Sequence, residues 1–252
     1  MTDSVLNVLL GLVASAIAAG LGWLAQTLRR RRRLGRLQAF FGLPDGGDCL
    51  LVVNRHASSS HPSSVQRNDV YALMELSGLV RECRGRAELV PHDKVLQGLG
   101  HKAEFCLGGP VSNDRTAAHL ASWLPGVSFT PDRVVEDFDP DDAAISVGDE
   151  TFRYVYGGDT RTGQAFVLLA RLHAEPGGRP VFLISGQSAI SNHAAVRYLV
   201  ANHRRLARRY GVDRTFALML RVVNPGAYGP DVVELASDVT AKASVRPAEA
   251  AA

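Results

Sequence analysis

Three features of the 252-residue sequence predict an α/β protein with an N-terminal transmembrane helix. The first is an uncharged stretch from Ser4 to Leu28, followed at once by a run of arginines. The second is the alternation of short apolar runs and helical periodicity from Cys49 onward. The third is a pair of alternating polar and apolar runs in the middle of the chain. Together they predict a mostly parallel sheet with helices on both faces and an inserted β-hairpin.

The uncharged stretch is long enough to cross a bilayer as one helix, since about 20 residues at ~1.5 Å each span the ~30 Å hydrocarbon layer. We expect a transmembrane helix over 5–28 and a basic juxtamembrane linker over 29–46. Positive charge stays on the cytoplasmic side, so Arg29–Arg33 predict a single-pass protein of the cell membrane, with its N-terminus outside and its domain in the cytoplasm. A cleaved signal peptide would carry basic residues before the apolar core, where this chain has Asp3.

The lipid bilayer is therefore the first predicted partner. The arginine run is explained by topology alone, and anionic lipid head groups are an additional possibility that the sequence leaves open. Small residues recur at every fourth position of the span, at Gly11, Ser15 and Ala19. This spacing lets two helices approach closely, so a homodimer through the transmembrane helix is a further prediction.

The charge and cysteine content exclude several classes of protein. Six of the 28 basic residues lie in Arg29–Arg36 and Asp3 is the only acid before them, which leaves 22 basic against 24 acidic side chains in the rest. A near-neutral domain argues against a nucleic-acid groove. Cys49, Cys83 and Cys106 are too scattered for a disulfide framework or a thiolate zinc site, and the eight histidines show no metal-binding spacing. We expect no metal and no cofactor.

The predicted domain covers 47–241, and its first half alternates strands with helices. Apolar runs predict strands at 49–54, 87–91 and 103–107. Asp69 is the expected cap of a helix that Gly85 ends, and Ser112 or Asn113 is the expected cap of a second helix that continues to about Leu124. Alternating buried strands and helices are typical of a Rossmann-like parallel sheet.

The second half begins with a change of pattern. Residues 144–157 form two alternating runs about a Gly-Asp-Glu turn, which predicts the inserted hairpin, and a strand follows at 163–172. The earlier pattern then returns with a buried strand at 180–185, a helix from Ser188–Asn192 to Arg209 that Gly211 ends, and strands at 215–223 and 232–239. We expect a disordered tail over 242–252.

Two strand-to-helix junctions are the candidate ligand site. In open α/β sheets ligands bind beyond the carboxyl ends of the strands, where helix starts offer free N–H groups to an anion. The sequence is neither G-x-G-x-x-G nor a P-loop, so it does not predict a standard dinucleotide or ATPase site. The alternative is that the glycines only shape turns and the polar residues only cap helices. The predicted ligand-binding residues here are Gly108, Gly109, Ser112, Asn113, Gly186, Ser188, Ser191 and Asn192.

The loops after the first two strands add two candidates, His56 and Asp93. His56 begins a loop with five serines, whose hydroxyls can bind phosphate, and a histidine can act as an acid or base near neutral pH. His92 and Asp93 end the second strand and can orient each other or a ligand ribose. For His56 the alternative is a mobile Ser-rich loop without a ligand role. Gly186-Gln187-Ser188-Ala189-Ile190 lacks the second glycine of a nucleophile elbow, so acyl transfer is disfavoured. We expect Cys106, in an apolar strand, to be a core residue.

The pair "strand, GGPVSN, helix" and "strand, SGQSA, Asn, helix" behind a membrane anchor resembles an uncharacterised Rossmann-like domain of bacterial, especially actinobacterial, membrane or regulatory proteins. The resemblance covers roughly Cys49–Thr240. It implies a cytoplasmic domain of unassigned activity that binds a small ligand, and it supplies no catalytic residues. The sequence thus favours a non-enzymatic ligand-binding or signalling module, with a nucleotide- or NAD-directed hydrolase or transferase and a protein-interaction scaffold as alternatives.

Overall fold

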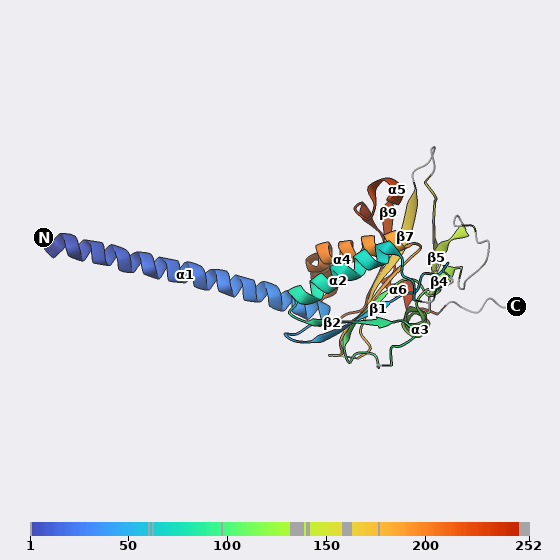
Figure 1. Cartoon of the computed structure of the whole chain (residues 1–252), viewed down its shortest axis with the longest axis horizontal. Coiled ribbons are helices and arrows are strands. Elements are labelled where there is room, and N and C mark those ends of the chain that lie inside the picture. Colours follow the sequence, from blue (N-terminus) through green and yellow to red (C-terminus); the bar gives the residue numbers. More distant parts are fainter. Residues whose placement is uncertain are drawn as a thin grey trace.

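A computed structural model describes residues 2–59, 61, 63–96, 98–131, 139, 142–157, 163–175 and 177–246. The side chains of 2–9, 11–14 and 16 lie outside this description. The molecule consists of a long N-terminal helix that projects from an α/β domain (Figure 1).

Helix α1 (Thr2–Phe41) is continuous through the arginine run, so most of the expected linker is helical. Its end belongs to the domain, because Leu37, Phe40 and Phe41 are buried in the core. Among the described residues, no helix combines the length and apolar character that a membrane span requires. The transmembrane helix over 5–28 therefore stays a prediction.

The central sheet has seven strands in the order β10-β9-β7-β8-β3-β1-β2. Strands β2, β1, β3 and β8 are parallel neighbours, whereas β7 runs antiparallel to β8 and β9, and β10 runs antiparallel to β9. The sheet is thus mixed, with five strands in one direction. Its strands are β1 (Asp48–Val53), β2 (Arg86–Pro91), β3 (Ala103–Leu107), β7 (Gln164–Leu172), β8 (Val181–Gly186), β9 (Phe216–Val223) and β10 (Val233–Asp238), which confirms every strand predicted for it.

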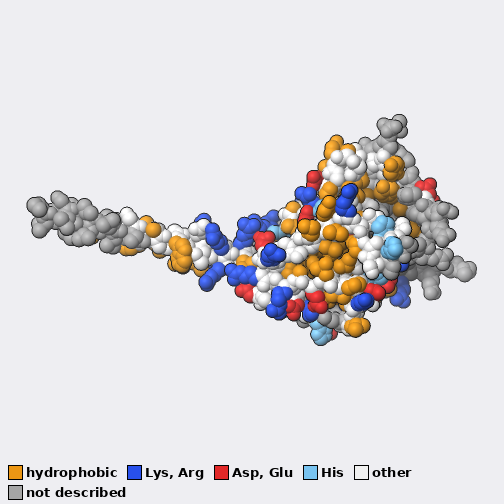
Figure 2. Space-filling view, in the orientation of Figure 1, with side chains coloured by type: hydrophobic (Ala, Val, Ile, Leu, Met, Phe, Trp, Pro, Cys, Tyr) orange, Lys and Arg blue, Asp and Glu red, His pale blue; other side chains and the backbone are white. Residues whose placement is uncertain are grey.

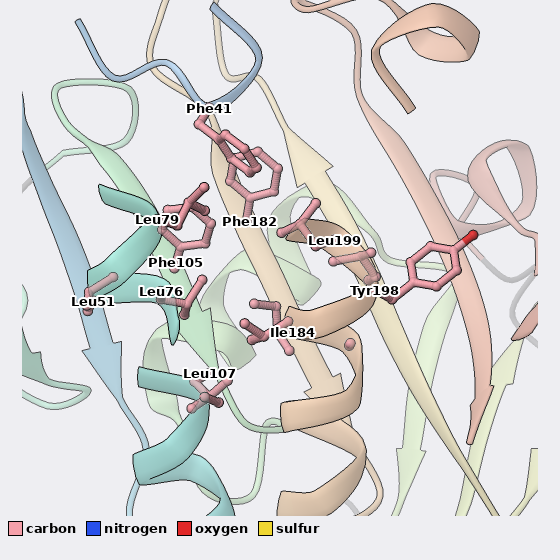
Figure 3. Packing of buried hydrophobic residues seen from close by; sticks show 14 of the residues in the cluster. Phe41, Leu51, Leu76, Leu79, Phe105, Leu107, Phe182, Ile184, Tyr198 and Leu199 are labelled. Carbon is pink, nitrogen blue, oxygen red and sulfur yellow. The ribbon is translucent and has the colours of Figure 1, made fainter. Parts of the chain in front are cut away.

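Helices cover both faces, as predicted. Helices α2 (Arg67–Glu82) and α4 (Ala189–Tyr210) pack with the end of α1 on one face, around a cluster that includes Phe105 and Phe182 (Figure 3). These two rings are stacked with centroids 4.8 Å apart. Helix α3 (Asp114–Trp123) lies on the other face. The burial of complete apolar strands on both faces explains why they carry few polar residues.

A second, antiparallel sheet covers part of the α3 face. The expected hairpin forms β5 (Ala144–Val147) and β6 (Glu150–Arg153), and an unpredicted strand, β4 (Val127–Thr130), pairs with β5. The short helices α5 (Pro225–Tyr228) and α6 (Thr240–Ala243) were not predicted either. The expected tail over 242–252 is wrong at its start, because Ala243 is buried and Lys242 pairs with Asp149 and Glu150; 247–252 lie outside the described residues.

Candidate functional site

The carboxyl ends of β1, β3 and β8 lie side by side, and helices α2, α3 and α4 start next to them; we call this region the carboxyl edge. Strand β1 lies between β2 and β3, so the chain leaves β1 toward one side and later returns to the other. Such a change of direction is where open α/β sheets bind ligands. Three helix starts together concentrate partial positive charge at this edge.

The two predicted junctions are adjacent at this edge. The N–H of Gly108 donates to the carbonyl of Ile184 at 2.9 Å, and a Cβ placed on Gly109 would lie 3.7 Å from the carbonyl oxygen of Gly186. The parallel pairing of β3 with β8 causes this proximity. Two segments far apart in the sequence thus lie against each other, with Gly108 buried and Gly109 and Gly186 partly exposed.

The two glycines after β3 differ in a way that the sequence did not reveal. Gly108 has φ +94°, and a Cβ there would lie 2.7 Å from Ser112 Oγ and 2.8 Å from Asn54 Cβ. Gly109 has no such φ, and a Cβ there would first meet the ring of Phe129 at 3.6 Å, an ordinary contact. Gly108 therefore takes the backbone conformation that favours glycine at this turn, and Gly109 does not.

A buried network that the sequence analysis missed joins these elements. Asp69 in the first turn of α2 accepts hydrogen bonds from Asn54 Nδ2 at 2.8 Å and from Asn192 Nδ2 at 2.9 Å. Asn192 Oδ1 in turn accepts from the N–H of Gly186 at 2.8 Å. Burial raises the pKa of Asp69, while the two amide hydrogen bonds act in the opposite direction. Asp69 is not the helix cap that we expected, because Gln66 occupies that position.

The predicted residues at the helix starts bond mainly to their own helices. Asn113 is fully buried; its Oδ1 accepts from the N–H of Thr116 and its Nδ2 donates to the carbonyl of Leu107. Ser188 and Ser191 form a capping box on α4. The capping alternative therefore accounts for these three side chains, and what remains for a ligand is backbone and the partly exposed Ser112.

The other two predicted residues do not join this group. His56 Nε2 lies 2.6 Å from Gln66 Nε2, and its Nδ1 accepts from the N–H of Ser58. Asp93 is exposed beyond β2, while its neighbour His92 lies 3.2 Å from Asp114 at the start of α3. Within the described part of the chain, no hydrogen bond or ion pair links His56 or Asp93 to the glycine junctions.

Several buried polar atoms at the carboxyl edge have no hydrogen-bond partner among the described residues, including Ser185 Oγ near the end of β8. Two others directly follow β1, the acceptor Asn54 Oδ1 and the donor Arg55 Nε. A buried polar atom without a partner is costly, so both favour an additional group such as water or a ligand. Two surface hollows lie elsewhere, one along α4 and one at the start of β1.

A second polar cluster connects β3 to α3. Glu104 accepts from Arg115 on both carboxylate oxygens, at 2.8 and 2.9 Å, and lies near His119 and Cys106. Burial would raise the pKa of Glu104, but the hydrogen bonds from His119, Arg115 and Cys106 outweigh it and lower the pKa to about 2. Glu104, Cys106 and His119 are close enough to hold a metal ion, yet Arg115 already occupies both oxygens. We interpret the cluster as structural, because it fastens α3 to β3.

Comparisons with protein-family models, curated proteins and solved structures find no match to this chain. The resemblance to an actinobacterial Rossmann-like domain thus stays a prediction, and function is argued from the geometry alone.

Proposed function

We propose that this protein is a single-pass, membrane-tethered module whose cytoplasmic domain binds a nucleotide-like or other anionic small molecule without converting it. The tether is supported by the uncharged run before Arg29 and by its continuity with the domain through α1. Because α1 is one continuous helix, its membrane-spanning part would connect directly to the domain that binds the ligand. The homodimer through this helix is part of the same proposal.

The observation that carries the ligand proposal is the convergence of three helix starts on two adjacent glycine junctions. Helix N-termini attract anions, and Gly109 has no side chain that would block the approach to its backbone, whereas Ser191 and Asn192 fill the space beside Gly186. A site built this way needs no lysine, which agrees with a nearly neutral domain. The partnerless Arg55 Nε adds one donor.

The test is a thermal-shift screen of the full chain against nucleotides, with product analysis of every compound that stabilises it. Gly109→Val should place a branched side chain in the approach path and weaken binding more than tenfold, above ~1.4 kcal/mol, while the protein stays folded. Gly226→Val is the control, because nothing lies within 4 Å of a Cβ there. Unchanged affinity in folded Gly109→Val would contradict the proposed site, and turnover would show an enzyme.

A protein-interaction scaffold is the second candidate, because α2 presents apolar side chains to solvent. Figure 2 shows exposed apolar side chains on the face that carries α2, and Val70, Tyr71 and Met74 of this helix are all exposed. Met74→Glu should abolish a protein contact through this patch and leave nucleotide binding unchanged. The hydrolase or transferase alternative lacks comparable support, since in the described residues no hydrogen bond or ion pair joins His56, His92 and Asp93 to one another.

A further inference from the structure

A groove runs along α4 on the side away from α2, where the sheet extends beyond the helical layer. Its volume is about 610 Å³, within the usual range of small-molecule sites. The groove exists because β10 forms the edge of the sheet beyond α4. It lies away from the carboxyl edge, along the C-terminal half of α4.

The floor of this groove is apolar and one wall is aromatic. The partly exposed Val233 and Leu235 of β10 form the floor, and Leu218 of β9 next to them is fully buried. Tyr198 and Arg205 line the wall from α4, where residues seven apart lie on the same side of a helix. In Figure 3, Tyr198 points away from the phenylalanine cluster toward the neighbouring strands.

The groove also holds a cation that lacks an acidic partner. Arg205 donates to the hydroxyl of Tyr198, and its guanidinium carbon lies 5.8 Å from the centre of that ring. The other charges that line the groove are neutralised: Arg209 pairs with Asp238 at 2.8 Å, and Glu234 pairs with Arg221. Among the described residues no carboxylate pairs with Arg205, so an anion can approach it directly.

We propose that this groove binds an anionic phospholipid, with its phosphate on Arg205 and the first part of its acyl chains on Val233 and Leu235. One positive charge beside an apolar floor is complementary to a molecule that is anionic at one end and apolar at the other. The end of α1 packs on the same helix, because the rings of Phe40 and His203 lie 6.3 Å apart. The bilayer as source of this lipid rests on the proposed tether, whereas the chemistry of the groove does not.

The test is calorimetric titration of the full chain, kept soluble with amphipol, with dihexanoyl phosphatidic acid below its micellar concentration. We expect saturable binding that Arg205→Gln weakens at least tenfold. Arg204→Gln is the matched control, since this neighbouring arginine is also exposed but does not line the groove. Leu235→Asn should weaken binding of the lipid without any change in charge, and it serves as a second variant if Arg205→Gln fails to fold.

Two further titrations distinguish the sources of binding. Inorganic phosphate should bind much more weakly than the lipid, because it makes no use of the floor, and zwitterionic dihexanoyl phosphatidylcholine should also bind weakly. Equal binding of phosphate, equal loss in Arg204→Gln and Arg205→Gln, or no saturable binding would each overturn the proposal. None of these outcomes depends on a ligand at the carboxyl edge.

Discussion

Two adjacent glycines after β3 show how differently single residues contribute to the carboxyl edge. Gly108 needs its positive φ and leaves no room for a side chain, whereas Gly109 has ordinary contacts. Gly108→Ala should destabilise the protein by about 2–4 kcal/mol, through backbone strain and overpacking. Gly109→Ala should change stability by less than about 1 kcal/mol. Urea unfolding measures both, and equal losses would contradict the assignment of the strained turn.

Asp69 provides a second test at this scale. Asp69→Ala would leave the buried amides of Asn54 and Asn192 without an acceptor, and each such loss costs ~1–3 kcal/mol. We expect a decrease of about 2–4 kcal/mol in the free energy of unfolding. Asp93→Ala, at an exposed site, should stay within about 0.5 kcal/mol. A small effect at Asp69 would mean that the network adds little to stability.

The residues of this network could not have been predicted as a group from the sequence. Asp69 and Asn192 are 123 positions apart and meet only because α2 and α4 start at the same edge. The junction glycines were recognisable because a strand, a glycine and a helix cap follow one another locally. The sequence therefore indicates where the chain turns, whereas the polar contacts across the turns depend on the tertiary structure.

At the scale of elements, strands and helices with complete apolar patterns were predictable, and short ones were not. The buried run of β3 is confirmed at its predicted bounds, and Gly211 ends α4 as expected. Strand β4 has only four residues, and α6 has one turn. Such short elements form because they pack against parts of the fold that lie next to them in space. The periodicity of the local sequence therefore does not reveal them.

The end of α1 illustrates an element held by tertiary contacts. Phe40 is buried, and the guanidinium carbon of the buried Arg171 lies 4.7 Å from the centre of its ring. Phe40→Ala should cost about 3–5 kcal/mol because it leaves a cavity beneath the helix. Leu28→Ala, on the projecting part of the same helix, should cost little. Similar losses in the two variants, measured by urea unfolding, would mean that α1 is not anchored through Phe40.

The ion pair between Glu104 of β3 and Arg115 of α3 should make the free energy of unfolding depend on pH. Because the pKa of Glu104 is about 2 in the folded protein and 4.5 ordinarily, its contribution of about 3 kcal/mol is present above pH 4.5 and is lost as the pH falls toward 2. Glu104→Gln should flatten this part of the stability profile. Glu88→Gln, which removes an exposed partner of Lys102, should leave it unchanged. A profile unaffected by Glu104→Gln would contradict the role of this ion pair.

At the scale of the whole molecule, the proposed function joins the α/β domain to a membrane through one helix. Figure 1 shows α1 projecting from the domain, and the exposed arginines Arg29–Arg33 lie along it. If residues 5–28 cross a bilayer, the arginines lie at its inner surface and the domain is in the cytoplasm. The same tethered domain would then bind both the ligand at the carboxyl edge and the proposed phospholipid.

Cysteine labelling in intact cells tests this claim most directly. The three native cysteines are buried, so an introduced cysteine would be the accessible one. The full chain with Ser4→Cys should react with a membrane-impermeant maleimide in intact cells. The chain with Ser244→Cys should react only after the cells are permeabilised. Labelling of Ser244→Cys in intact cells, or of neither variant before permeabilisation, would contradict a membrane-tethered cytoplasmic domain.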